Sequence, residues 1–182
     1  TGSALLTGAL HEDGLADLAD GIWGGSTPER RLAIMSDSQI GAYGAIALIV
    51  SVAGRAAAIA TIGQPLFVLG ALVAAEAASR AVMPALMSFS GPAKSDGLGA
   101  SAGTPGVATW GSALFLAAVI CVLAAPAGWF TCLIAAAAGA ALISWFARRN
   151  LGGYTGDVLG AAQQIAELFA LTAIASVIAE AG

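Results

Sequence analysis

The feature that most constrains this chain is a stretch of 51 residues without a charged side chain, between Asp96 and Arg148. The stretch is too long for one membrane span, and a turn-forming Ala-Pro-Ala-Gly sequence at 125–128 interrupts it near its middle. A helix needs about 20 residues to cross ~30 Å of hydrocarbon. The stretch therefore predicts two helices, roughly 107–125 and 127–147, joined by a tight turn.

Other apolar runs predict three further spans, at about 40–62, 65–87 and 158–179. The first ten residues are also apolar, but as a helix they would extend only ~15 Å, so we interpret them as the end of an earlier span of a longer protein. A chain with 58% hydrophobic and only 10% charged residues is neither a soluble domain nor a disordered segment. Ala-rich runs without period-two alternation favour helices over a β-barrel. The predicted fold class is all-α: a polytopic transmembrane bundle in the lipid bilayer, with about five spans and a partial N-terminal one.

The charged residues predict the orientation of these spans. Threading them through a bilayer places the connections 11–39, 88–106 and 148–157 on one face and the two short Gly/Pro turns on the other. Five of the seven basic residues then share the charged face: Arg30, Arg31, Lys94, Arg148 and Arg149. The positive-inside rule makes this face cytoplasmic. A net charge of −4 without a basic patch argues against a nucleic-acid partner.

An acidic segment lies beside the predicted membrane at the amino end, where six of the eleven acids fall between Glu12 and Asp37. Asp13, Asp17 and Asp20 are spaced i, i+4, i+7, which places them within about 60° of one another on a helix. Because like charges at this spacing repel, we expect a cation on the stripe. Mg²⁺ suits it, because this ion is usually bound by one or two carboxylates together with substrate phosphates. The alternative is a solvated acidic loop.

The acidic segment is the first of several distinctive motifs along the chain. They are HEDGLADLADG at 11–21, ERR at 29–31, MSDSQIGAYG at 35–44, SR at 79–80, GLG at 97–99 and GGYTGDVLG at 152–160. Together these motifs resemble the cobalamin synthase family, also called adenosylcobinamide-GDP ribazoletransferases. Two features differ from the family pattern. Members have further membrane-embedded residues before the His-x-Asp-Gly segment, and Lys94 stands where an Arg is expected.

The resemblance implies a multi-pass enzyme of the bacterial inner membrane that depends on Mg²⁺ and has its active site on the cytoplasmic face. The hydroxyl of α-ribazole, or of its 5′-phosphate, would attack the cobinamide-linked phosphorus of adenosylcobinamide-GDP and release GMP. The product would be adenosylcobalamin or its phosphate. Residues 1–182 would form a single membrane-embedded catalytic domain that is incomplete at its N-terminus relative to the family.

Phosphoryl transfer requires neutralised charge and a correctly placed nucleophile, which suggests roles for the acidic residues. We predict five metal ligands: Asp13, Asp17, Asp20, Asp37 and Asp157. Either Asp17 or Asp20 is expected to accept the proton of the attacking hydroxyl. For Asp37 and Asp157 the alternative role is capping a helix N-terminus. His11 is a candidate catalytic residue whose alternative is a helix-end or packing role.

The substrate-binding candidates are mostly basic residues and small residues beside predicted helix starts. They are Arg55, Arg80, Lys94, Ser38 and Gly156. Arg80 and Arg55 lie within predicted spans and would contact the pyrophosphate or the charge that develops on it. Alternatively, Arg80 pairs with Glu76 four residues earlier, while Glu167 in the last span must find a partner inside the bundle.

Two other classes of protein share parts of this pattern. CDP-alcohol phosphotransferases also use a series of aspartates that begins with Asp-Gly, but their Ala-Arg after that pair is absent here. A transporter could use the charged residues of the spans to line a pathway. Because the acids are densest at the inner surface instead of the membrane midplane, the pattern favours a transferase.

Overall fold

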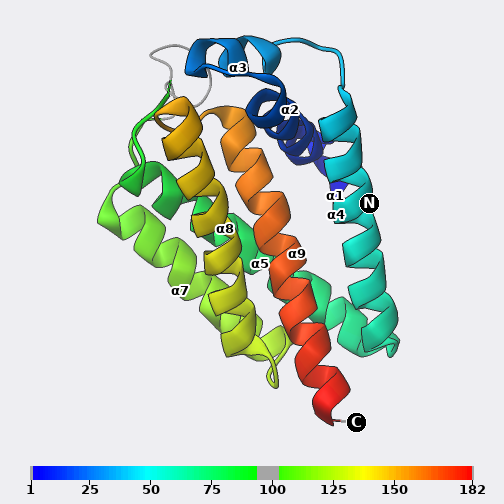
Figure 1. Cartoon of the computed structure of the whole chain (residues 1–182). Helices are drawn as coiled ribbons and strands as arrows, with labels where there is room; N and C mark the ends of the chain where they lie inside the picture. Colours follow the sequence, from blue (N-terminus) through cyan, green and yellow to red (C-terminus); the bar gives the residue numbers. More distant parts are fainter. Residues whose placement is uncertain (1, 94–102, 182) are drawn as a thin grey trace.

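The computed structural model of the chain describes residues 2–93 and 103–181, which form helices joined by short connections (Figure 1). The helices are α1 (Gly2–Thr7), α2 (Leu10–Gly24), α3 (Pro28–Ile34), α4 (Ala42–Ile62), α5 (Pro65–Phe89), α7 (Val107–Ala124), α8 (Trp129–Leu151) and α9 (Gly156–Ala181). Over these residues the only extended pairing is an isolated parallel bridge between Pro92 and Tyr154. The predicted all-α fold class is confirmed.

Five of these helices, α4, α5, α7, α8 and α9, are long and apolar enough to cross a membrane. They coincide with the five predicted spans, with ends that differ by four residues or fewer. The largest difference is at the end of α8, which continues past the first charged residues to Leu151. Arg148 and Arg149 are good helix formers that favour the negative end of the helix dipole, and Gly152 then ends α8 in the left-handed conformation at φ 82°.

The first ten residues differ from the single helical segment that was expected. Helix α1 ends at Thr7, and Gly8 and Ala9 both have a positive φ, of 63° and 60°. These two left-handed residues turn the chain into α2, which begins at Leu10. The apolar N-terminal run is therefore divided between a short helix and the start of the acidic one.

The charged connections and the two short Gly/Pro turns lie at opposite ends of the bundle, as the sequence predicted. The α4–α5 and α7–α8 turns lie at one end of the bundle, and α3, the end of α8 and the start of α9 lie at the other (Figure 1). Helix α2 lies beside the start of α4 near that second end. Lys94 falls outside the described residues, so its predicted role stays a prediction.

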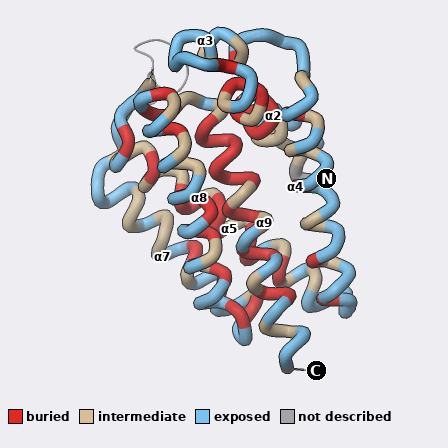
Figure 2. The backbone as a smooth tube through the Cα atoms, viewed as in Figure 1, coloured by how far each residue is buried: buried red, intermediate tan, exposed pale blue. Residues whose placement is uncertain are grey.

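Helix α9 is the centre of the bundle and contacts α8, α2, α5 and α4. Over the most apolar window of each helix, 56% of the residues of α9 are buried, against 22% for α4 and 11% for α7. Figure 2 shows this difference as a buried core on α9 and α5 with exposed outer helices. The exposed apolar faces of α4 and α7 are those expected to meet lipid.

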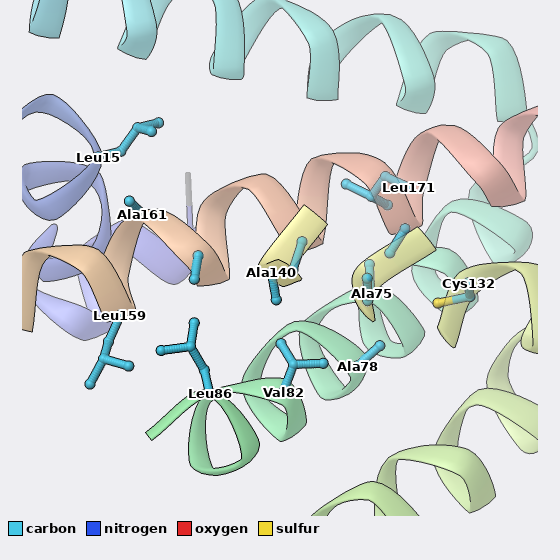
Figure 3. Packing of buried hydrophobic residues seen from close by; sticks show 14 of the residues in the cluster. Leu15, Ala75, Ala78, Val82, Leu86, Cys132, Ala140, Leu159, Ala161 and Leu171 are labelled. Atoms are coloured by element: carbon cyan, nitrogen blue, oxygen red, sulfur yellow. The ribbon is translucent and has the colours of Figure 1, made fainter. Parts of the chain in front are cut away.

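Small residues allow the central helices to approach closely. Buried alanines of α5, α8 and α9, among them Ala75, Ala140 and Ala161, belong to one core cluster (Figure 3). At Gly139 of α8 an added Cβ would lie 3.0 Å from Cα of Ala166 in α9. Without a hydrophobic driving force between helices in lipid, such close van der Waals packing is what stabilises the bundle.

A network of polar side chains crosses this apolar core. Nη1 of Arg55 in α4 lies 3.3 Å from Oε2 of Glu167 in α9, and both side chains are largely buried. Nε2 of Gln163 donates to the same Oε2 at 3.0 Å and to Oγ of Ser79 in α5 at 3.1 Å. The partner that Glu167 was predicted to need is therefore Arg55, and the network joins three spans.

We predict that Glu167→Leu lowers the free energy of unfolding by ~3 kcal/mol, because it leaves the Arg55 guanidinium buried without a counter-charge. The double variant Arg55→Leu/Glu167→Leu should lose less than the sum of the single variants, which denaturant titration in detergent measures. Glu180→Leu, at the exposed end of α9, is the matched control and should change stability little. Additive losses would contradict a coupled pair.

Candidate active site

Helix α2 carries four of the eleven acidic residues and is held against α9 at two glycines. A Cβ added at Gly14 would lie 2.7 Å from the backbone oxygen of Asp157, and one added at Gly160 would lie 3.1 Å from Cα of His11. Only glycine permits backbones to approach this closely without a displacement. These contacts fix α2 beside the N-terminus of α9, which brings Asp157 near the acidic stripe.

Between α2 and the segment that leads into α4 lies a cavity of about 330 Å³, which we call the carboxylate pocket. It is lined by Ala9, Glu12, Asp13, Ala16, Asp17, Asp37, Ser38, Ile40 and Leu48. Three predicted metal ligands, Asp13, Asp17 and Asp37, therefore share one pocket with the predicted substrate-binding residue Ser38. The pocket combines carboxylate oxygens with one hydroxyl and apolar walls.

Asp20 takes a different position from the one predicted for a metal ligand or general base. Its side chain accepts hydrogen bonds from the backbone N–H groups of Gly41, at 2.7 Å, and Gly44, at 2.9 Å. The residue is only 8% exposed and does not line the carboxylate pocket. Because both carboxylate oxygens accept hydrogen bonds from the N-terminus of α4, Asp20 joins α2 to α4, and its predicted role as a ligand or base stays a prediction.

Asp37 does not cap α4 as the alternative role proposed, and at the N-terminus of α9 the hydroxyl of Thr155 takes part in the cap. Oδ1 of Asp37 accepts from the backbone N–H of Gln39 at 3.1 Å, a local turn that precedes the start of α4. The N-terminus of α9 is capped by Thr155, whose Oγ1 accepts from the N–H of Val158 at 3.2 Å. Thr155 also donates to Oδ2 of Asp157 at 3.3 Å.

The pocket places acidic groups close enough to change their ionisation. The pKa of Asp17 is raised from 3.8 to about 6, first by burial and then by the charges of Asp13, Asp157 and Asp20. Asp157 thus lies within electrostatic reach of Asp17 although it does not line the pocket. Gly156, the predicted substrate-binding residue beside it, begins α9 and is exposed.

Sequence reasoning missed Glu12, which lines the carboxylate pocket. Its Oε2 is buried without a hydrogen-bond partner in the described structure. On the helix Glu12 is about 100° from Asp13, outside the stripe that the i, i+4, i+7 spacing defines. It reaches the pocket because the segment containing Asp37 and Ile40 closes over that side of α2.

The donor chemistry of the pocket suits a hard divalent cation. Four carboxylates surround one space, one of them carries a buried oxygen without a hydrogen-bond partner, and burial together with the charge of Asp13 raises the pKa of Asp17. No three His, Cys, Asp or Glu side chains of residues 2–93 and 103–181 converge as a complete metal cluster. Mg²⁺ does not require one, since it is commonly held by one or two carboxylates with phosphate oxygens and water.

The predicted catalytic histidine and the arginines lie outside the pocket lining. The pKa of His11 is lowered, mainly by burial and then by the charge of Arg80. Arg80 itself pairs with Glu76, as the alternative reading of that spacing proposed, and Arg55 pairs with Glu167. Arg55 and Arg80 therefore belong to the polar groups of the spans, whereas His11 lies on α2 beside Glu12, outside the pocket lining.

Comparison with known proteins identifies relatives over nearly the whole chain. The family model described as Cobalamin-5-phosphate synthase matches residues 1–175. A protein of Rhizobium etli (strain CIAT 652) is 50% identical over 95% of this chain and 70% of its own length. Proteins of Bradyrhizobium diazoefficiens and Mesorhizobium japonicum are 46% and 43% identical, each over 96% of this chain and 67% of their own length. All three are named adenosylcobinamide-GDP ribazoletransferase. No solved structure is significantly similar to the chain.

We predict that Asp20→Ala lowers the free energy of unfolding by about 1–2 kcal/mol, because it removes both acceptors from the N-terminus of α4. Asp20→Asn retains one acceptor oxygen and should lose less. Thermal denaturation in detergent measures both variants, and equal losses would contradict the capping role.

We predict that Asp17→Asn raises the Tm of the protein above pH 6 and leaves it unchanged near pH 4, measured in the presence of EDTA. With its pKa raised to about 6, folded Asp17 holds its proton more tightly than the unfolded chain does. Its contribution to stability therefore falls as the pH rises from about 3.8 to 6, and asparagine removes that loss.

The control for this pH effect is Glu29→Gln on α3. Glu29 is exposed and its pKa is lowered, chiefly by a hydrogen bond to its own backbone N–H and then by Thr27. Neutralising it should not raise the Tm at any pH. An Asp17→Asn effect of equal size at pH 4 and pH 7 would show that repulsion in the pocket is not its cause.

Proposed function

Because this chain belongs to the cobalamin-5-phosphate synthase family, we propose that it is an adenosylcobinamide-GDP ribazoletransferase. It would join α-ribazole, or its 5′-phosphate, to adenosylcobinamide-GDP and release GMP. The observation that carries the proposal, beside family membership, is the carboxylate pocket at the charged end of a membrane bundle. Asp13 and Asp17 there face Asp37 and Ser38 across one cavity.

In the proposed reaction the ribose hydroxyl oxygen forms a bond to the phosphorus attached to cobinamide. The bond from that phosphorus to the bridging oxygen breaks, and GMP leaves with the electron pair. Asp17 is the residue best placed to accept the hydroxyl proton, because it lines the pocket and Asp20 does not. The protein's task is to position the two reactants in line and to balance charge.

We assign the Mg²⁺-binding role to Asp13, Asp17 and Asp37, with Glu12 and Asp157 adding negative charge nearby. When bound, Mg²⁺ supplies charge neutralisation for the phosphate oxygens. Ser38 offers a hydroxyl to the same space, and Ile40 and Leu48 limit the access of water. This division of roles follows from which side chains line the pocket.

The proposed site faces the cytoplasm of a bacterial inner membrane. Arg30, Arg31, Arg148 and Arg149 lie at the same end of the bundle as the pocket, and basic residues mark the cytoplasmic side of membrane proteins. Nucleotide substrates and Mg²⁺ are present on that side. A large corrinoid could therefore reach the aspartates without crossing the bilayer.

The contacts of the charged residues within the spans argue against the transporter alternative. The charges that would line a pathway are paired with one another, Arg55 with Glu167 and Arg80 with Glu76. The CDP-alcohol phosphotransferase alternative is replaced by the family match over residues 1–175. The proposed transferase activity gives a role to Asp13 and Asp17 of the pocket, which have no basic partner in the described structure.

We predict that the reconstituted protein releases GMP from adenosylcobinamide-GDP only when α-ribazole or its phosphate and Mg²⁺ are present, and that EDTA abolishes the release. Asp17→Asn should lower kcat by at least about 100-fold, the usual effect of losing a general base. Chromatography of the released GMP measures the rate.

The matched control is Glu29→Gln, which removes one negative charge from the same end of the bundle outside the pocket. It should retain wild-type turnover. Full activity of Asp17→Asn would refute its assigned role, and GMP release that is indifferent to EDTA would refute the role of the cation.

A further inference from the structure

A second polar cavity lies on α8, at the charged end of the bundle, and shares no residue with the carboxylate pocket. It is a groove of about 750 Å³ lined by Ala141, Ser144, Trp145, Arg148 and Arg149. These positions follow i, i+3, i+4, i+7 and i+8, so they form one continuous face over ~12 Å of helix. The groove therefore has small and aromatic residues toward the membrane and two guanidinium groups at its outer end.

This face of α8 is open because of how its neighbours pack. Helix α7 packs mainly against α5, and α8 packs mainly against α9, so the two helices of the α7–α8 hairpin have fewer contacts with each other. Trp145 is 52% exposed, and Ala141, Arg148 and Arg149 are exposed as well. The groove thus opens toward the surroundings of the bundle and not into its core.

The positive charge of the groove is not neutralised by the described part of the protein. The ion pairs of residues 2–93 and 103–181 involve Arg55 and Arg80, and no carboxylate in those ranges pairs with Arg148 or Arg149. The guanidinium of Arg149 lies 5.7 Å from the ring centroid of Trp145, a cation–π contact. This contact holds the Arg149 side chain along the groove.

The ligand that fits this arrangement is amphipathic and anionic. Trp and Arg at the end of a membrane-spanning helix lie at the level of lipid headgroups. An apolar wall that continues into the span would contact an acyl chain, while the two guanidinium groups would contact a phosphate at the interface. A free nucleotide or inorganic phosphate would use the arginines but would leave the apolar wall without a partner.

We infer that the groove of α8 is a binding site for one anionic phospholipid of the cytoplasmic leaflet, with Arg148 and Arg149 on its phosphate and Trp145 beside its upper acyl chain. The site is independent of the proposed transferase activity. Ser144 takes part in a hydrogen bond with Ser90, between their Oγ atoms at 3.0 Å, which ties this part of α8 to the end of α5. Lipid bound here would therefore contact a helix whose position is already fixed.

The test is native mass spectrometry of the detergent-purified protein titrated with phosphatidylglycerol or with phosphatidylcholine of the same acyl chains. We expect the first phosphatidylglycerol to bind at least about tenfold more tightly than phosphatidylcholine. Arg149→Gln should weaken it about fivefold and Arg148→Gln/Arg149→Gln about 25-fold, since each surface arginine contributes about a factor of five. Raising the salt concentration should reduce the preference of the wild-type protein.

Arg30→Gln is the matched control, because it removes one exposed positive charge from the same end of the bundle outside the groove. It should leave the first binding event unchanged. An equal loss in Arg30→Gln and Arg149→Gln would overturn the site in favour of general surface charge. Displacement of the lipid by equimolar glycerol 3-phosphate would overturn the lipid in favour of a soluble phosphate ligand.

The same variants separate lipid binding from a structural role for the arginines. At the C-terminus of α8, Arg148 and Arg149 also complement the helix dipole, so their removal is expected to lower the Tm modestly. That effect would appear without any lipid. If Arg149→Gln lowered only the Tm and kept the wild-type preference for phosphatidylglycerol, the proposal would be wrong.

Discussion

The candidate site depends on the two hydrogen bonds that Asp20 accepts from the first turn of α4. They connect the helix that carries Asp13 and Asp17 with the segment that carries Asp37 and Ser38. Gly41 and Gly44 make this connection feasible, because a Cβ at either position would overlap the Asp20 carboxylate. One buried carboxylate thus sets the distance between the two walls of the pocket. This contribution of Asp20 is geometric.

The walls that Asp20 holds together carry charges that repel. Deprotonated Asp17 is unfavourable beside Asp13 and Asp157, and the helix packing through Gly14 gives these groups little freedom to separate. A folded protein that maintains such repulsion loses stability at neutral pH unless a cation is bound. For the Mg²⁺ and phosphate binding that we propose, the same arrangement would lower the cost, because the acids are already positioned.

The spans were predictable from the sequence because each is a long run without charge, and the end of a run marks where lipid ends. The sequence also showed that Asp13, Asp17 and Asp20 share a helix face. It could not show that α4 begins directly against Asp20, because that contact joins Asp20 to residues 21 and 24 positions away, on the far side of α3. The Arg55–Glu167 pair, 112 residues apart, was equally hidden, although the cost of a lone charge in lipid predicted that Glu167 had a partner. Glu12 was missed because it faces the pocket from outside the periodic stripe.

Pairing distinguishes structural charges from functional ones in this protein. Among the described residues, the two arginines that lie away from the span ends have a carboxylate partner, Arg55 with Glu167 and Arg80 with Glu76, which is the state that a low-dielectric environment favours. Asp13 and Asp17 have no basic partner in the described structure, although several arginines lie at the same end of the bundle. An arginine beside them would relieve the repulsion and lower the pKa of Asp17, but it would also occupy the space and the charge that a metal–phosphate complex needs. Among the described residues no basic side chain pairs with Asp13 or Asp17, whereas Arg55 and Glu167 inside the bundle pair with each other. This contrast is the physical reason for proposing that these aspartates carry the chemistry.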